Sequence, residues 1–210
     1  MALVVVPAKP LSRAKLRLAP VLSPEERRFL CLAMLADVCA AAAEAECGRV
    51  MVIASDTDAE AVARVFGATV VKDPTPEAGL NTSLDAAIPA DPGGVLIVAS
   101  DLPACSAAEL RSVAGFEGVR IATDAGGTGT NALWRRPPGV IAPAFGDDSA
   151  RRHRKAAAEA GAAFEAVAPA GLSFDVDLPT DLFLAWDAPV GPNTRSALRE
   201  LGFPDRIITT

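Results

Sequence analysis

Residues 95–109 read VLIVASDLPACSAAE, an apolar run followed by a carboxylate and the start of a helix. The aliphatic residues 95–99 predict a short strand that is buried on both faces. Ser106 and Glu109 have the spacing of a capping box, which starts a helix after Asp101-Leu102-Pro103. A doubly buried strand that continues into a helix is typical of a parallel sheet covered by helices.

The same alternation continues in both directions along the chain. Further strands are predicted at residues 3–6, 50–54, 69–71, 119–123, 131–134, 164–167 and 174–176. Further helices are predicted at residues 24–47, 58–66, 80–88, 148–160, 180–186 and 193–201. This order predicts an α/β fold with a mostly parallel sheet, whose ligand crevice lies at the carboxyl ends of the strands. We expect one domain over residues 1–187 and a C-terminal tail with a short helix over 188–210.

The composition excludes several classes of protein. With 20 basic and 26 acidic residues the formal charge is −6, which argues against a nucleic-acid partner. The apolar segments are too short, or too often interrupted by acids, for a membrane span or a leader peptide, so we expect a soluble cytoplasmic protein. The four cysteines, at positions 31, 39, 47 and 105, lack metal-binding spacing and are expected to be reduced thiols. Any metal would then be bound by oxygen ligands.

The first strand is followed by a basic segment in this acidic chain. Residues 7–18 read PAKPLSRAKLRL, with four cations and no acid. Such a loop lies over the crevice, where its cations can hold a polyphosphate, although a solvated basic loop fits the pattern equally well. The loop has neither the glycine-rich phosphate-binding pattern nor the dinucleotide fingerprint, which weakens kinase-like and dehydrogenase-like interpretations.

Two Asp-Leu-Pro tripeptides place carboxylates where strands end. Asp101 follows the strand at 95–99, and Asp177 follows the segment 174–176, with Asp175 two residues earlier. Carboxylates that converge on one crevice can hold Mg²⁺ together with substrate phosphates and water. The alternative is that Asp101 and Asp177 each cap the helix that follows.

A third set of residues suggests an anion site. The glycine-rich segment 126–131 precedes Gly146, and Ser149 and His153 then lie on one face of the helix predicted at 148–160. Backbone amides at such a helix start can bind a phosphate. An ordinary hairpin for the glycine segment and a solvated surface imidazole for His153 remain open.

These segments together resemble the 2-phospho-L-lactate/phosphoenolpyruvate guanylyltransferases (CofC/FbiD type) of coenzyme F-420 biosynthesis. The resemblance covers residues 3 to about 185 and rests on Pro-x-Lys-Pro-Leu at 7–11, Gly-Leu-Asn at 79–81, Ser-Asp-Leu-Pro at 100–103, Gly-Thr-Asn at 129–131, Gly146-x-x-Ser149-x-x-x-His153 and Asp175-Val-Asp177-x-Pro179. Leu178 stands where this family usually has threonine, a change that should not remove a ligand.

The resemblance implies a three-layer α/β/α, Rossmann-like nucleotidyltransferase fold and the transfer of GMP from GTP to a small phosphorylated three-carbon acid. It also implies that Asp101 and Asp177 bind Mg²⁺ and that Thr130, Gly146 and Ser149 bind the acid. The acid is 2-phospho-L-lactate, phosphoenolpyruvate or 3-phospho-D-glycerate, and the Arg- and Ala-rich composition favours phosphoenolpyruvate. Pyrophosphate is released, and the product passes to the next enzyme of the pathway.

A mechanism with these parts fits a chain that has no tyrosine and a single histidine. A phosphomonoester is already ionised at pH 7, so it needs no side-chain base to attack a phosphorus atom. We expect Lys9, Lys15 and Arg17 to act on the triphosphate, with Asp175 as a further metal ligand. GTP would also be bound by Ser12, Gly79, Leu80 and Asn81, and His153 would support the acceptor.

Two other functions and three details stay open at this point. A molybdenum-cofactor or sugar-phosphate nucleotidyltransferase of the same fold usually carries a glycine-rich loop after the first strand, which residues 7–18 lack. The other alternative is a nucleotide-binding α/β domain without catalysis. The number of Mg²⁺ ions, the residues that read guanine and the oligomeric state are undetermined, and Leu198 and Leu201 are expected either to cover the core or to pair two copies in a homodimer.

Overall fold

The computed structural model describes residues 2–8, 10–11, 14–89 and 93–207. They form one sheet with the strand order β3-β2-β1-β4-β6-β5-β7. The strands are β1 Leu3–Ala8, β2 Arg49–Ala54, β3 Thr69–Lys72, β4 Val95–Val98, β5 Gly118–Thr123, β6 Thr130–Arg136 and β7 Phe164–Val167. β6 runs antiparallel to both of its neighbours, and the remaining pairs are parallel. The prediction of a mostly parallel α/β sheet is therefore confirmed.

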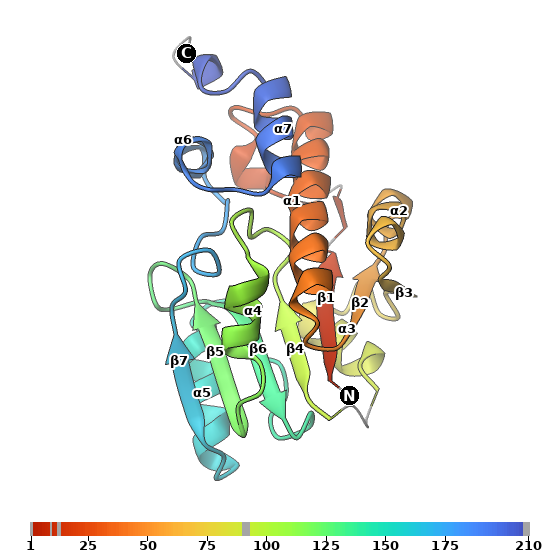
Figure 1. The fold of residues 1–210 in the computed structure, drawn as a ribbon, viewed down its shortest axis with the longest axis vertical. Helices are drawn as coiled ribbons and strands as arrows, with labels where there is room; N and C mark the ends of the chain where they lie inside the picture. Colours follow the sequence, from red (N-terminus) through yellow and green to blue (C-terminus); the bar gives the residue numbers. More distant parts are fainter. Residues whose placement is uncertain (1, 9, 12–13, 90–92, 208–210) are drawn as a thin grey trace.

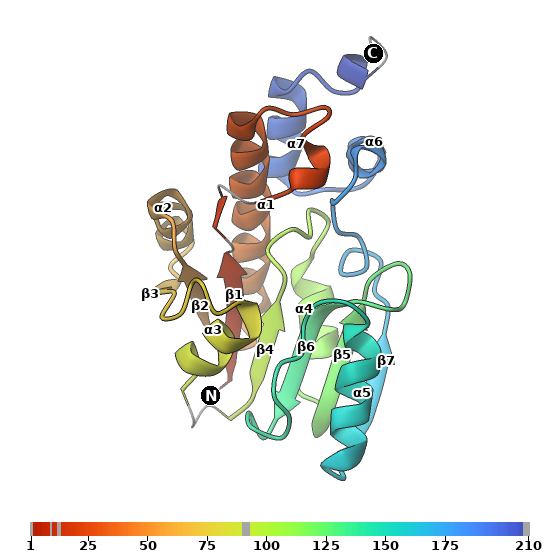
Figure 2. The same ribbon diagram turned by 180° about the vertical axis from the view of Figure 1, so that it is seen from behind.

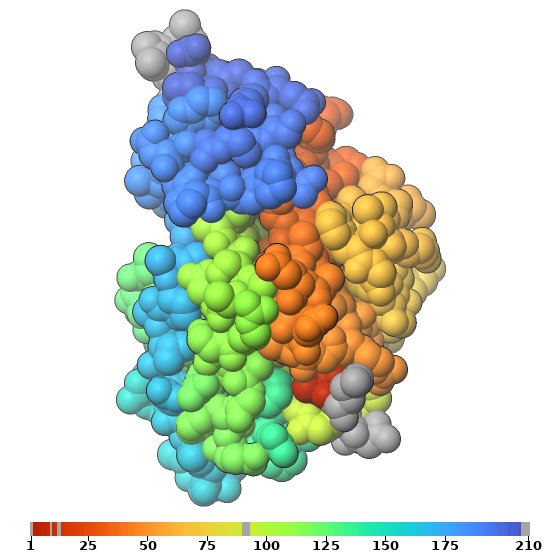
Figure 3. Space-filling view, in the orientation of Figure 1, coloured from red at the N-terminus to blue at the C-terminus, as the bar shows by residue number. Residues whose placement is uncertain are grey.

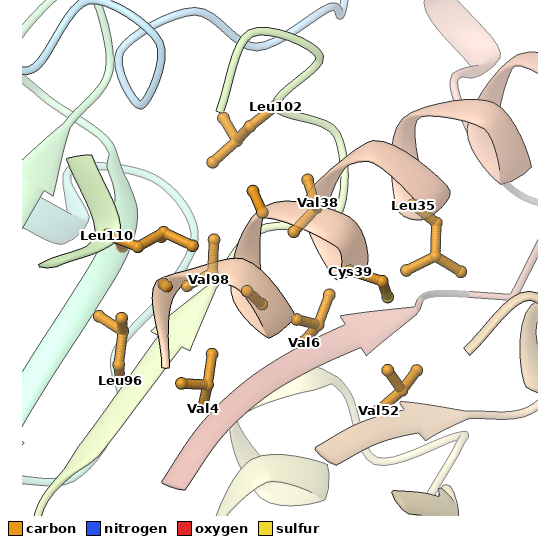
Figure 4. Packing of buried hydrophobic residues seen from close by; sticks show 14 of the residues in the cluster. Val4, Val6, Leu35, Val38, Cys39, Val52, Leu96, Val98, Leu102 and Leu110 are labelled. Carbon is orange, nitrogen blue, oxygen red and sulfur yellow. The ribbon is translucent and has the colours of Figure 1, made fainter. Parts of the chain in front are cut away.

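Helices cover both faces of this sheet and make it the middle of three layers. One face carries α1 (Pro24–Ala45), α2 (Thr57–Val65) and α4 (Ala107–Val113), as Figure 1 shows. The opposite face carries α3 (Leu80–Ala87) and α5 (Ser149–Glu159), seen in front in Figure 2. Because side chains alternate along a strand, Val4 and Val6 of β1 pack under α1 (Figure 4), whereas Leu3 and Val5 belong to the core on the side of α3 and α5.

α1 is longer than the strands and carries a third core beyond their carboxyl ends. Leu30 and Met34 of α1 pack there with residues of α6 (Pro179–Asp187) and α7 (Pro192–Glu200). In Figure 3 this C-terminal segment covers one end of the molecule. Leu198 and Leu201 are buried in this core, so within one chain they cover the core.

Asp37 of α1 fixes the start of α7. Its carboxylate accepts hydrogen bonds from the backbone N–H groups of Asn193 (3.0 Å) and Thr194 (2.8 Å) and from the Asn193 side-chain amide (2.8 Å). Gly191 allows this approach, because a Cβ atom there would lie 2.2 Å from Asp37 Cγ. The tail helix therefore shares a core with α1, and the division of the chain at residue 187 stays a prediction.

The strand predicted at 174–176 is wrong. The N–H groups of Leu172 and Ser173 turn back to the Pro169 carbonyl, and Val176 N–H donates to Asp101 O at 3.4 Å. The segment thus lies against the loop after β4 instead of joining the sheet, although its apolar residues resemble a strand. The remaining predicted strands and helices are present, with ends shifted by a few residues.

The four cysteines form no disulfide. Within the described part of the chain, no helix is long and apolar enough to cross a membrane.

Candidate active site

Four adjoining cavities follow the carboxyl ends of the central strands, and the smallest, of about 150 Å³, is lined by Lys15 together with Asp101 and Asp177. The central cavity, of about 310 Å³, is lined from β1, α3 and β4, from β6 and from the segments before α5 and α6. Pro7 and Leu80 also line a cavity on the side of β3, and Thr130 and Gly146 also line one on the side of α5. This is the crevice that the order of the elements predicts.

Lys15 lies between the two aspartates that follow the Asp-Leu-Pro pattern. Its ammonium donates hydrogen bonds to Asp101 Oδ2 and, at 2.7 Å, to Asp177 Oδ1. The Lys15 side chain is only 7% exposed. Burial by itself lowers the pKa of Lys15, but the two carboxylates outweigh burial and raise it above the ordinary value. Lys15 is therefore a nearly buried cation that bridges the two carboxylates, and Arg17 reaches the other oxygen of Asp177 at 3.9 Å.

Neither aspartate is used to cap a helix. Ser106 caps α4 with Glu109, and the Asp181 side chain accepts the N–H groups of Asp177 and Leu178 at the start of α6. The alternative of two N-cap aspartates is thus excluded by the partners that the helix starts use. Both carboxylates instead line the central cavity.

Asp175 lies close to this pair. Burial, and then the charges of Asp101 and Asp177, raise the pKa of its carboxyl group, while its Oδ1 lies 3.5 Å from the Asn131 side-chain amide. Among the described residues no group of three or more His, Cys, Asp or Glu side chains is arranged to hold a metal by itself. The donor set of two or three carboxylates still fits Mg²⁺, which commonly takes one or two carboxylates and completes its shell with phosphates and water.

The cavity on the side of α5 gathers the residues expected to bind the acid. Thr130, Gly146 and Ser149 line it together with Arg17. Gly146 has φ of 113°, a conformation that favours glycine, and its carbonyl accepts the Ser149 N–H at 3.2 Å. One wall of this cavity is therefore formed by the loop with Gly146, the start of β6 at Thr130 and the start of α5 at Ser149.

His153 stands behind this wall and is fully buried. Its Nε2 accepts the Ala144 N–H at 2.9 Å, and its Nδ1 lies 3.0 Å from the Thr130 hydroxyl. Since Nε2 accepts, a neutral ring carries its proton on Nδ1 and donates it to Thr130 Oγ1. Burial, then the charges of Arg152 and Arg135, lower the pKa of His153 to about 4. The surface-imidazole alternative is therefore wrong, and His153 contacts two residues that line the cavities, Thr130 by a hydrogen bond and Phe145 by an edge-to-face ring contact.

The residues expected near the nucleotide fall in two groups. Gly79 and Leu80 line the cavity on the side of β3. Asn81 instead forms a pair of bonds with one backbone unit: its amide nitrogen donates to Phe145 O (3.0 Å) and its oxygen accepts Phe145 N–H (2.8 Å). Asn81 thus ties α3 to the loop that carries Gly146. Lys9 and Ser12 lie outside the described residues.

Asp124 is a site residue that sequence reasoning missed. The glycine segment is the hairpin turn between the antiparallel strands β5 and β6, as the alternative had it, and it also lines the cavity on the side of α5. Asp124 Oδ1 accepts the Thr128 N–H at 2.9 Å, and a Cβ atom at Gly129 would lie 2.6 Å from Oδ2. An aspartate two residues before a glycine-rich segment was the available signal.

A family model and a protein similar in sequence both match nearly the whole chain. A family model described as guanylyl transferase CofC like matches residues 2–207. A phosphoenolpyruvate guanylyltransferase of Nocardia farcinica is 40% identical over 213 aligned positions, which cover 96% of this chain and 92% of that protein.

Two solved structures share the fold. A nucleotidyl transferase from Methanothermobacter superposes with a TM-score of 0.63 at 22% identity, over 95% of this chain and 99% of that one. Rv0371c of Mycobacterium tuberculosis, in complex with manganese, gives a TM-score of 0.53 at 20% identity, over 89% and 98% of the two chains.

Proposed function

The chain belongs to the CofC-like guanylyl transferase family, and from this premise we propose that it transfers GMP from GTP to phosphoenolpyruvate and releases pyrophosphate, as a step of coenzyme F-420 biosynthesis. The acceptor follows from the 40% identical relative, which is named for phosphoenolpyruvate and matches along nearly its whole length. The observation that carries the proposal is the Asp101–Lys15–Asp177 cluster, whose two carboxylates line the central cavity. This cavity shares residues with the one on the side of β3, which we assign to the nucleotide, and with the one on the side of α5, which we call the acceptor cavity.

Asp101 and Asp177 would hold Mg²⁺, with Asp175 as a further ligand. Support comes from the charges around the acceptor cavity, which is lined by five aspartates at positions 124, 147, 148, 175 and 177 and by a single cation, Arg17, among the described residues. A phosphorylated acid and a triphosphate can approach such a surface only when added positive charge neutralises it. A structural neighbour was crystallised with manganese, and a bound divalent ion would supply charge neutralisation at the reacting phosphates.

The protein's own residues would then position two anions for one displacement. Lys15 and Arg17, with Lys9, would hold the triphosphate and stabilise the leaving pyrophosphate, while Thr130, Gly146 and Ser149 hold the acceptor. An oxygen of the acceptor's phosphate attacks the α-phosphorus, the bond to the β-phosphate oxygen breaks, and pyrophosphate departs. Because the attacking oxygen is already ionised, the reaction needs no base from the protein. The neutral His153 would act by orienting the Thr130 hydroxyl.

We expect the enzyme to work in the cytoplasm, where GTP is available, and to pass its product to the next enzyme of the pathway. A homodimer is compatible with this site, which is built within one chain.

Pyrophosphate release tests the function directly. The purified chain is incubated with GTP and Mg²⁺ and with phosphoenolpyruvate, 2-phospho-L-lactate or 3-phospho-D-glycerate in separate reactions. We expect release with phosphoenolpyruvate and, from an equal mixture of the acids, a product with the mass of its guanylyl adduct. ATP in place of GTP is the control. No release with any of the three acids would refute the proposal.

A further inference from the structure

The cavity on the side of β3 has the size and wall chemistry of a base pocket. Its volume is about 210 Å³, whereas a cavity of about 150 Å³ holds a benzene ring. Pro10, Ile53, Pro76 and Leu84 give it apolar walls, and among the described lining residues Asp73 is the one that carries a charge. Most small-molecule pockets combine apolar walls with a few fixed polar groups in this way.

Asp73 is held in place by the ends of two strands. It follows β3, and its backbone N–H donates to Ala54 O at 2.9 Å. Its Oδ1 accepts the Thr75 N–H at 3.0 Å, and its Oδ2 lies 3.4 Å from the Ser55 hydroxyl. An ionised carboxylate has about four acceptor sites, so both oxygens keep capacity for a further donor.

We propose that Asp73 is the residue that selects guanine, by accepting the N1–H and the 2-amino group of the base. This inference rests on the proposed use of GTP and deepens it. Adenine presents a ring acceptor at the same edge, which a carboxylate repels, and it has no 2-amino group.

The position of the pocket suits this role. Its shared residues Pro7 and Leu80 connect it with the cavity of Asp101 and Asp177. β3 and β4 are three strands apart in the sheet, or about 14 Å at a spacing of about 4.8 Å per strand. An extended nucleotide can therefore place its base edge at Asp73 and its phosphates at the metal site.

The test exchanges one acceptor for a donor without changing the shape of the side chain. Asp73→Asn keeps an oxygen for the Thr75 N–H and presents an amide N–H₂ to the base, which matches the 2-oxo group of xanthine. We expect kcat/KM for GTP to fall about 100-fold and kcat/KM for XTP to rise above the wild-type value. Asp187→Asn, an exposed position at the end of α6, is the matched control and should leave the GTP-to-XTP ratio unchanged. An unchanged ratio in Asp73→Asn would overturn the assignment.

Calorimetric titration of GTP and XTP without any acceptor separates this inference from the reaction itself. If the wild-type protein binds GTP and Asp73→Asn prefers XTP, while no acid yields pyrophosphate, the base assignment stands and the proposed reaction fails. If the wild-type protein binds no GTP, or if Asp73→Asn binds GTP as tightly as the wild type, the base assignment is overturned.

Discussion

Lys15 and Asp177 are joined by a hydrogen bond of 2.7 Å between an ammonium and a carboxylate 162 residues apart in sequence. The same ammonium also reaches Asp101. Lys15 therefore occupies the space between the two carboxylates that are proposed to bind Mg²⁺. Because an ammonium and a divalent ion cannot share that position, we expect metal binding to displace Lys15, whose ammonium could then contact the triphosphate.

Removing this ammonium should strengthen metal binding while it weakens catalysis. In Lys15→Met the divalent ion no longer displaces a charge-assisted hydrogen bond, which contributes about 1.5 kcal/mol or more. We expect the Kd for Mn²⁺ without nucleotide to fall about tenfold, measured by electron paramagnetic resonance. Pyrophosphate release should fall at the same time. Lys155→Met, at an exposed position of α5, should change neither, and an equal or weaker Mn²⁺ affinity in Lys15→Met would contradict the displacement.

The three aspartates should differ in their effect on turnover. Asp101→Asn and Asp177→Asn each remove a proposed ligand, and a loss of about 3 kcal/mol in transition-state stabilisation lowers kcat/KM about 100-fold. Asp175→Asn should cost less, because Asp175 flanks the pair. Circular dichroism establishes that each variant folds. A variant of Asp101 or Asp177 with wild-type turnover would remove that residue from the metal site.

The sequence predicts those parts of this molecule that depend on local pattern. The position of Asp101 could be predicted because a carboxylate that follows a buried apolar strand lies at the carboxyl end of that strand, where the crevice forms. The segment 174–176 could not be placed, since an apolar triplet resembles a strand whether or not a neighbouring strand pairs with it.

Contacts between residues far apart in the sequence could not be predicted either, because a local pattern does not show which segments pack together. Asp37 caps a helix that begins 155 residues later, and Asn81 binds the backbone of Phe145. The surface alternative for His153 stayed open in the sequence because Arg151, Arg152 and Arg154 flank it. The spacing of Ser149, His153 and Ala157 on α5 does mark one buried helical face, and that was the signal to follow.

Asn81 should affect the acceptor more than the nucleotide. Asn81→Ala removes both hydrogen bonds to Phe145 and releases the loop with Gly146, so we expect the KM for the acid to rise about tenfold, as for about 1.4 kcal/mol of lost positioning. Asn81→Asp, which turns an oxygen toward Phe145 O, should be at least as impaired. If the KM for GTP rises instead while that for the acid is unchanged, Asn81 contacts the nucleotide directly.

Asp37 should matter for stability. Asp37→Ala removes three hydrogen bonds to a buried carboxylate and leaves the Asn193 and Thr194 N–H groups without their acceptor at the start of α7. The expected cost is about 3 kcal/mol, which lowers Tm by roughly 6–12 °C in a chain of this size. Amide exchange in α7 should accelerate. Glu44→Ala, exposed on the same helix, is the control, and a similar Tm in both variants would contradict the role of Asp37.

His153 should make the protein less stable in acid. The pKa of its ring is about 4 in the folded chain, against an ordinary value of 6.5, so the unfolded chain binds the extra proton first. The stability that comes from the neutral ring is complete above pH 6.5 and is lost as the pH falls toward 4. Between pH 7 and pH 5 the wild type should lose on the order of 2 kcal/mol more unfolding free energy than His153→Asn, as measured by urea titration. Both proteins share every other titrating group, so the difference isolates His153, and equal losses in the two proteins would show that the buried ring is not the source.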